Sequence, residues 1–319
     1  MSANVETMAY AGEVPWHGLG VKIEDTITPE DLLVTSGLDW NAVKRPLKFV
    51  GEDGKDHSTG TYALVRDRDN KVLSASVSKG WKPVQNKEAL GFFQEFCDAG
   101  TMKMETAGSL SNGQFVFALA RIQESFTLPG QDKVDAFLLF SNPHKVGNSI
   151  NVQFTPIRVV CSNTLAMALD GESSGRFRSF HTATFSADEA KEALGLAKNN
   201  FASFKGAAQF LASKRWDEEK LHEYFKTLFP ANTSSQGEDD MAANGFSRRA
   251  AMCAANMDSQ PGAEMSEGTW WQAFNAVTFA TDHLFGRSND TRMKNSWFGW
   301  TRQRKQEALT LATKFANAA

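Results

Sequence analysis

The sequence predicts an α+β protein, with an antiparallel, strand-rich first half that contains an interspersed helix, followed by a helical second half. Two observations lead to this prediction. Before about residue 175, Val, Ile, Thr and Phe recur in short runs that Gly, Asn, Asp and Pro interrupt, which is typical of strands and turns. After about residue 186, apolar residues repeat at helical spacing. We therefore expect a strand-rich domain over residues 1–185 and a helical domain over residues 186–319.

The first half contains six segments with the composition of strands. They are residues 40–50, 61–66, 72–78, 114–122, 134–141 and 150–161. Ser111, Asn112 and Gly113 predict a hairpin turn before the fourth segment, because Asn-Gly tolerates positive φ. Residues 86–99 interrupt the strands with apolar side chains at helical spacing, which predicts a helix.

The second half begins with an apolar seam from Ala190 to Leu211 that repeats at alternating spacings of four and three residues. Such a seam packs within the protomer or against a neighbouring copy. Asp217 then opens a shorter helix that Pro230 stops, and residues 231–240 form a polar loop. Further helices are expected over residues 241–257, 269–285 and 297–316.

The overall composition excludes several classes of protein. The 319 residues carry 34 Lys and Arg against 37 Asp and Glu, a formal charge of −3, so an anionic partner would have to meet a local groove. No apolar run approaches the roughly 18 residues of a membrane span, and the first residues lack the pattern of a signal peptide. Cys97, Cys161 and Cys253 are too far apart for a CxxC metal motif. We expect a cytoplasmic protein without a disulfide framework.

Several catalytic motifs are incomplete. Gly18 and Gly20 begin a dinucleotide fingerprint, but Ile23 replaces its third glycine, and the sequence has no P-loop. The nucleophile-elbow spelling from Gly171 to Gly175 lacks a preceding strand and a following helix. His222 begins a metalloprotease-like string, but Lys226 replaces the second histidine. We therefore expect no cofactor and no metal.

An enzyme stays open only as a site assembled from distant residues. The first residues to inspect for such a site are His17, His144, His181 and Asp170.

The positive signals are cationic. Arg158 interrupts an apolar strand, where it requires either an ion pair or an anion-binding groove. Arg176 and Arg178 are two residues apart, which places them on one face of a strand. Lys79 and Lys82 flank Trp81, which we interpret either as a solvated hairpin tip or as the rim of a binding groove with an exposed aromatic.

Two aromatic segments have simpler interpretations. The turn around Trp16 and His17 fits a tryptophan under an N-terminal arm. Near the C-terminus, tryptophans alternate with basic residues, and we expect them to anchor the core more often than to stack on bases. This block comprises Trp270, Trp271, Phe274, Trp297, Trp300, Arg302, Arg304 and Lys305.

Four segments together resemble the phage/plasmid-like domain-of-unknown-function family. They are Pro15-Trp16-His17-Gly18, Trp81-Lys82-Pro83-Val84-Gln85-Asn86, Ile157-Arg158-Val159-Val160-Cys161-Ser162-Asn163-Thr164-Leu165, and Asn275-Ala276-Val277-Thr278 with Asp282-His283. Within the third segment, Ser162 or Asn163 is expected to cap a following helix. The genomic setting of the family and the strand-rich half imply a remote similarity to single-strand annealing proteins of the RecT and Redβ kind.

This resemblance implies a protein that binds single-stranded DNA and anneals strands without ATP in phage or plasmid recombination, acting as a homo-oligomer. Arg158, Arg176 and Arg178 would contact phosphates, Lys79 and Lys82 would form the rim, and Trp81 would be a stacking surface. Any nuclease or single-strand-binding protein partner is left open. The alternative is a phage- or plasmid-encoded interaction protein that blocks a host factor.

Overall fold

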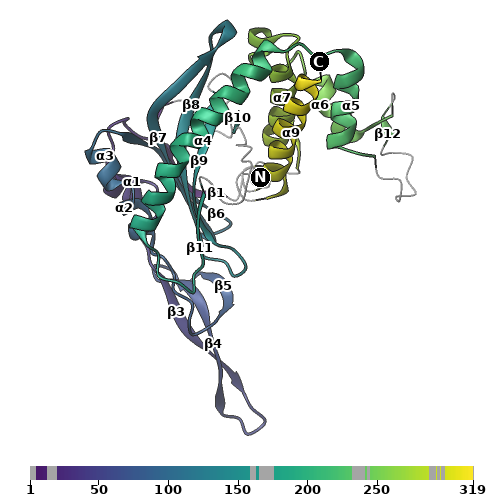
Figure 1. Ribbon diagram of the computed structural model, residues 1–319. Coiled ribbons are helices and arrows are strands. Elements are labelled where there is room, and N and C mark those ends of the chain that lie inside the picture. The colour runs from purple at the N-terminus through teal and green to yellow at the C-terminus, as the bar shows by residue number, and fades with distance from the viewer. Residues whose placement is uncertain are drawn as a thin grey trace. The chain divides into compact units, whose positions relative to one another are not determined.

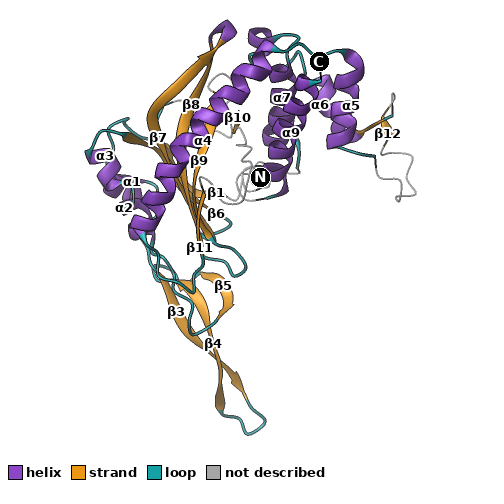
Figure 2. Ribbon diagram, viewed as in Figure 1, coloured by secondary structure: helices purple, strands orange, loops and turns teal. Residues whose placement is uncertain are grey.

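The computed structural model describes residues 5–12, 20–158, 163–164, 176–231, 241–242, 245–286, 292, 295 and 299–318. Strands predominate in the first half of the chain and helices in the second (Figures 1 and 2), so the α+β prediction is confirmed. None of the helices within these residues is long and apolar enough to cross a bilayer.

The chain forms two compact units that are discontinuous in sequence. The strand-rich unit contains Met1–Gln123, Phe137–Phe154 and Gly175–Ala197, and the helical unit contains Glu124–Ala136, Thr155–Ser174 and Lys198–Ala319. The chain therefore passes between the units several times, whereas the sequence predicted one boundary after residue 185.

The larger sheet has the strand order β10-β9-β8-β7-β6-β1-β2, and β11 also pairs with β9. Its strands are β1 (Val5–Tyr10), β2 (Val21–Lys22), β6 (Met102–Leu110), β7 (Phe115–Leu128), β8 (Asp132–Pro143), β9 (Ile150–Arg158), β10 (Asn163–Thr164) and β11 (Arg176–Ser179). The β6–β7, β9–β10 and β9–β11 pairs are antiparallel, while β1 and β2 are parallel.

The predicted turn joins β6 to β7. Ser111, Asn112 and Gly113 have φ values of 53°, 60° and 82°, so the hairpin prediction is confirmed. Sequence reasoning missed β1 and β6, whose register pairs Gly108 with Met8: a Cβ at residue 108 would lie 2.5 Å from the Thr7 carbonyl oxygen. This close approach explains a glycine inside a strand.

The second sheet has the order β3-β4-β5 and is antiparallel. It contains β3 (Ala42–Val50), β4 (Asp56–Arg66) and β5 (Val72–Val77). The strand-rich unit also holds α1 (Pro29–Thr35), α2 (Asn86–Gly91) and α3 (Gln94–Asp98), so the single helix predicted over residues 86–99 is two short helices. Its core includes Phe92, Phe93, Phe140 and Phe185, with 5.4 Å between the ring centroids of the last two.

The helical unit contains most of α4 (Ala187–Ser213) together with α5 (Glu218–Leu228), α6 (Arg248–Ala255), α7 (Trp270–Phe279), the π-helical turn η4 (Ala280–Leu284) and α9 (Trp300–Asn317). It also contains the short elements η1 (Pro129–Gln131), β12 (Met241–Ala242), β13 (Phe246–Ser247) and η3 (Ala263–Ser266). α5 and α7 begin at side-chain caps: Asp217 accepts the Lys220 N–H, and Thr269 accepts the Gln272 N–H.

The core of the helical unit is aromatic. Trp270, Trp271 and Tyr224 are completely buried, and the Tyr224 hydroxyl donates to the Ala308 carbonyl at 3.2 Å. The two adjacent tryptophans are therefore core anchors, as the sequence favoured. Trp297 and the predicted loop over residues 232–240 lie outside the described residues.

The predicted apolar seam lies on α4. Phe201, Phe204, Ala208 and Leu211 are buried in the helical unit, and the Phe201 ring lies 5.5 Å from that of Phe126. This part of the seam therefore packs within the protomer.

Candidate functional site

The predicted arginines stand on the strands at one edge of the larger sheet. Arg178 of β11 is opposite Asn151 of β9, and Arg176 is opposite Gln153. Arg158 is opposite Asn163 in the β9–β10 pair, so Asn163 lies in a strand and the prediction that it caps a helix is wrong. Strand pairing in place of helix initiation accounts for the difference. Ser162 and the side chains of Arg158 and Arg176 lie outside the described residues.

Arg178 is exposed and is held by neutral groups. Its Nε donates to the Ser149 hydroxyl at 2.8 Å, and its guanidinium carbon lies 4.7 Å from the ring centroid of Phe180. Phe180 is 55 % exposed, which is unusual for a large apolar side chain. An exposed guanidinium beside an exposed aromatic ring can contact both a phosphate and a base.

Trp81 is only 8 % exposed, and one face of its indole stacks on His181 with 4.3 Å between ring centroids. The prediction of an exposed stacking surface at Trp81 is therefore wrong, because the ring contributes to the core instead. The exposed aromatic beside the cations is Phe180, which sequence reasoning missed; its position two residues after Arg178 was the available signal.

The loop containing Trp81 lies beside the segment that follows β11. The Lys82 backbone N–H donates to the His181 carbonyl, and the Lys82 ammonium donates to the Thr184 hydroxyl at 3.0 Å. Lys82 is therefore brought to the same region as Arg178 by contacts between segments that are about 100 residues apart in sequence. The segment around Lys79 follows β5 and leads to α2, so it is not the tip of a hairpin.

Lys79 and Lys44 extend this cationic region. Lys79 is exposed, and its carbonyl accepts a hydrogen bond from the Lys44 ammonium at 2.8 Å. The Lys44 ammonium also lies 5.4 Å from the ring centroid of Tyr62. We call Lys44, Lys79, Lys82 and Arg178 the cationic surface. Lys44 was not predicted, because nothing in its local sequence distinguishes it from other surface lysines.

The four cations of this surface share one property. Within the described part of the chain, none of them forms an ion pair with a carboxylate; their contacts are to hydroxyl, carbonyl and aromatic groups. Other cations of the same unit are paired: Arg68 lies 3.5 Å from Asp39, and Lys87 lies 3.4 Å from Glu30. The cationic surface is therefore available to an external anion.

Two of the histidines considered for catalysis, His144 and His181, are buried. The His144 Nε2 is 3.0 Å from the Asn86 Oδ1, and burial lowers the pKa of His144 to about 3. Burial also lowers the pKa of His181. Both imidazoles are therefore neutral at physiological pH. His17 and Asp170 lie outside the described residues, and the described ones contain no group of three or more His, Cys, Asp or Glu side chains arranged to hold a metal.

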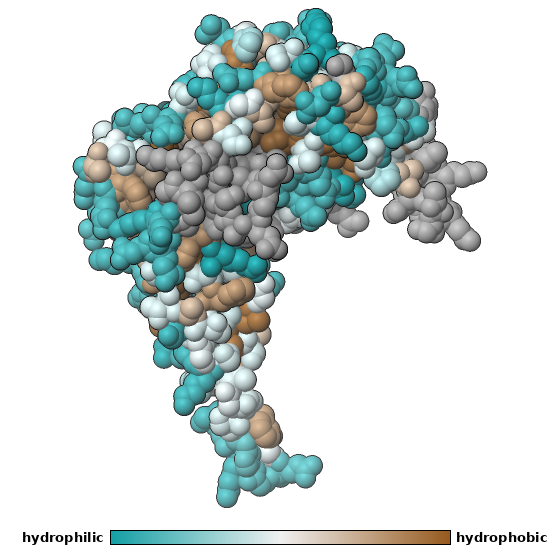
Figure 3. All heavy atoms as spheres, viewed as in Figure 1, coloured by the Kyte–Doolittle hydropathy of each residue, from teal (hydrophilic) through white to brown (hydrophobic). Residues whose placement is uncertain are grey.

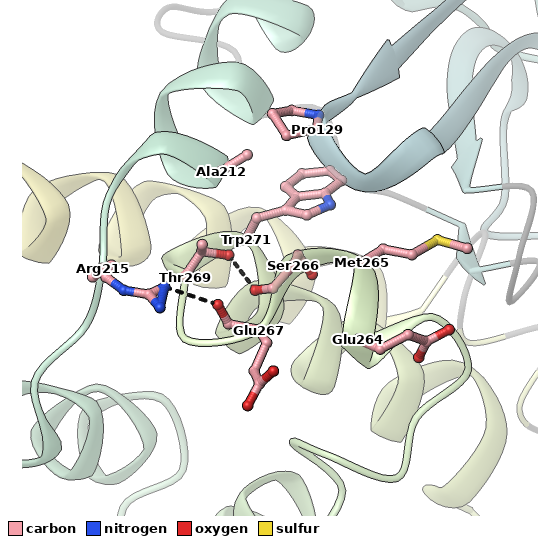
Figure 4. Close-up of a pocket in the computed structure, with 9 residues that line it drawn as sticks. All are labelled: Pro129, Ala212, Arg215, Glu264, Met265, Ser266, Glu267, Thr269 and Trp271. Carbon is pink, nitrogen blue, oxygen red and sulfur yellow. Dashed lines mark hydrogen bonds between the residues drawn. The ribbon is translucent and has the colours of Figure 1, made fainter.

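The helical unit has an open pocket of about 300 Å³ between the end of α4 and the start of α7 (Figure 4). The Arg215 guanidinium donates to the Glu267 carbonyl at 3.2 Å, and the Thr269 hydroxyl donates to the Ser266 carbonyl at 2.6 Å. The Glu264 and Glu267 side chains extend away from Trp271. Because the carboxylates do not converge, the pocket does not have the arrangement of an acid–base site.

The helical unit also contains a buried ion pair between α9 and η4. The Lys305 ammonium lies 2.8 Å from the Asp282 carboxylate, and both side chains are less than 10 % exposed. Burial lowers the pKa of Lys305, although the carboxylate of Asp282 opposes that shift. The predicted basic block at the C-terminus is thus divided: Lys305 is a core residue, while Trp300 stays 39 % exposed.

Fold and surface together define an α+β protein whose strand-rich unit carries cations that form no ion pair within the part of the chain described. The chain belongs to a family defined as a domain of unknown function, DUF932, whose model matches residues 73–313. No curated protein and no solved structure matches the chain. The matched range includes Lys79, Lys82 and Arg178, while Lys44 precedes it.

Proposed function

We propose that this protein binds single-stranded DNA and anneals complementary strands without ATP, in phage or plasmid recombination. The observation that carries the proposal is the absence of carboxylate partners around Lys44, Lys79, Lys82 and Arg178 among the described residues. Phosphate contacts supply most of the affinity of nonspecific nucleic-acid binding, and they require cations that are not already neutralised.

Phe180 supports a single strand over a duplex as the ligand. Base stacking on an exposed aromatic ring requires bases that are not already stacked in a helix. The Phe180 ring is 55 % exposed and adjacent to the Arg178 guanidinium, so one nucleotide could place its phosphate on Arg178 and its base on Phe180.

Annealing requires only that the protein bind a single strand and leave its bases accessible to a complementary strand. The bases of the bound strand must face outward, so the protein needs cations, few aromatics and no catalytic group. A few cations per chain give a small footprint, and we therefore propose that a homo-oligomer repeats the surface along the strand. A partner nuclease or single-strand-binding protein is compatible with this arrangement.

The proposal is tested by fluorescence anisotropy with a labelled oligothymidine at several salt concentrations. The double variant Lys82→Ala/Arg178→Ala should bind more weakly, and the magnitude of its slope of log affinity against log salt should fall by about 1.4, since each neutralised phosphate contributes about 0.7. The matched control is Arg68→Ala/Lys87→Ala, which removes the same charge from cations that already have carboxylate partners.

Equal losses in the two double variants would show that net charge, rather than this surface, causes binding. Absence of binding at about 50 mM salt, or an affinity that does not change with salt concentration, would overturn the proposal and favour an interaction protein. Annealing itself is measured with complementary fluorophore- and quencher-labelled oligonucleotides in the absence of ATP. The wild-type chain should accelerate quenching, and Lys82→Ala/Arg178→Ala should not.

A further inference from the structure

The β3–β4 hairpin continues beyond its sheet. β5 pairs with β4 only over Tyr62–Val65, while β3 and β4 remain paired with each other out to Val50 and Asp56. The end of the hairpin is therefore two-stranded and exposed on both faces (Figure 1). Two-stranded hairpins are only marginally stable in water, so a long one without a third strand requires local stabilisation or a partner.

The hairpin tip, residues 48–58, is held in a defined shape. The Asp53 carboxylate is 2.9 Å from the His57 Nε2, and the His57 ring stacks on Phe49 across the strands with 5.5 Å between centroids. The Gly51 N–H donates to the Lys55 carbonyl at 2.9 Å. A Cβ at Gly51 would lie 2.7 Å from the His57 ring, so a larger residue there would displace the ring from this arrangement. A preordered tip binds without a large loss of conformational entropy.

The chemistry of the tip specifies its partner. Phe49 is 55 % exposed and Val50 is 70 % exposed, and the tip carries three carboxylates, on Glu52, Asp53 and Asp56, against two ammoniums, on Lys48 and Lys55. The Lys48 ammonium lies 3.4 Å from the Asp56 carboxylate in an exposed pair, and the tip keeps a net negative charge. Figure 3 shows the end of the hairpin as mainly hydrophilic, with a hydrophobic area on one side. Excess negative charge disfavours nucleic acid and anionic membranes, so the tip fits a surface that is both apolar and basic.

The same chain carries such a surface on its helical unit. The Arg249 guanidinium lies 4.7 Å from the ring centroid of Trp300, which is 39 % exposed. Arg248 and Arg249 are both exposed in the first turn of α6, a turn without acidic residues. Cations at a helix N-terminus oppose the helix dipole, so their position there is unfavourable unless an anion binds. Neither arginine forms an ion pair with a carboxylate of the described residues.

We propose that the hairpin tip of one copy docks on the Arg248, Arg249 and Trp300 surface of a second copy. Glu52 and Asp56 would face the two arginines, and Val50, which is paired with Asp56 and shares its face of the hairpin, would cover the Trp300 ring. Because the two surfaces differ, each copy carries one tip and one receiving surface, and the contact either joins successive copies into rings or filaments or is exchanged between two copies. This inference rests on the homo-oligomer of the proposed function and supplies its contact, while its test contains no DNA and so fails or succeeds separately from the binding test.

Charge reversal tests the contact by sedimentation velocity over a range of protein concentrations, without DNA. The wild-type chain should assemble, whereas Glu52→Lys/Asp56→Lys and Arg248→Glu/Arg249→Glu should each sediment as monomers, because like charges then face each other. An equimolar mixture of the two variants should assemble again, since each reversed tip meets a reversed surface. Circular dichroism checks that both variants are folded.

A wild-type chain that stays monomeric, variants that assemble like it, or a mixture that stays monomeric would each overturn the proposal. If Arg248→Glu/Arg249→Glu abolishes oligothymidine binding but leaves assembly unchanged, the surface serves nucleic acid and docking is excluded. Should a charge-reversed variant fail to fold, a photo-crosslinking amino acid in place of Val50 gives a second test. Its crosslinks should map to α6 or to the start of α9 of another copy, and crosslinks elsewhere would contradict the model.

Discussion

Two arginine environments in the strand-rich unit differ in what surrounds the guanidinium. Arg66 is 3 % exposed and donates to both carboxylate oxygens of Glu6, at 2.8 and 2.9 Å, and to Asp69. Arg178 is exposed and contacts only a hydroxyl and an aromatic ring among the described residues. The first arginine is neutralised and contributes to the fold, while the second keeps its charge for a ligand.

The buried pair of Lys305 and Asp282 in the helical unit is a second example of a cation that a carboxylate neutralises. There the cation is almost fully buried and the carboxylate is nearly as enclosed. Breaking a pair of this kind leaves one charge in an environment of low polarity. Substitutions in the three environments should therefore differ in their effects, from a large loss of folding stability to a loss of binding alone.

The largest effect is expected at Lys305. Lys305→Met leaves the Asp282 carboxylate buried without the ammonium, and the free energy of unfolding should fall by about 3–5 kcal/mol. Urea denaturation measures the change. The double variant Asp282→Leu/Lys305→Met removes both charges and should recover much of the loss; equal destabilisation of the single and double variants would contradict the role assigned to the charges.

A smaller effect, with a dependence on pH, is expected at Arg66. Burial by itself raises the pKa of Glu6, but hydrogen bonds from Arg66 and Lys71 outweigh it and hold that pKa below its ordinary value of 4.5. The pair therefore stabilises the fold above pH 4.5, and this contribution is lost as the pH falls through the lowered pKa. Arg66→Met should lose about 1–3 kcal/mol at pH 7 and less at pH 3.

The exposed pair of Lys48 and Asp56 provides the control for Arg66. Its side chains are more than half exposed, so Lys48→Met should cost less than about 1 kcal/mol. Thermal unfolding of both variants at pH 7 and pH 3 gives the comparison. A loss at Arg66→Met that is the same at both pH values would show that Glu6 contributes little, because the hydrogen bond from Arg66 lowers the pKa of Asp69 so far that its carboxylate keeps its charge at pH 3.

The smallest effect on folding, and a clear one on binding, is expected at Phe180. Phe180→Ala should leave the melting temperature nearly unchanged because the ring is exposed, and should weaken oligothymidine binding by about 1–3 kcal/mol. Phe49→Ala removes an equally exposed ring from the hairpin tip and should not change that affinity. Equal binding by the wild-type chain and Phe180→Ala would remove stacking from the proposed site.

The sequence was most informative where a pattern is local. The turn at Ser111–Gly113, the cap at Asp217 and the buried pair of tryptophans at 270–271 were all predicted correctly, because each depends on nearby residues. β1 and β6 were missed because their pairing with each other joins distant segments. Trp81 was misassigned for a similar reason: its burial depends on His181, 100 residues away.

By itself the sequence determined the α+β class and the positions of most helices and strands, because hydrophobic spacing and turn residues act over a few neighbours. It also limited the candidates to a few arginines and lysines. Only the tertiary structure decided which cations meet a carboxylate, as Arg66 and Lys305 do, and which, like Arg178, meet none among the described residues. Whether a cation has a carboxylate partner depends on contacts between segments that are distant in the chain. The packing of the strands and helices determines those contacts.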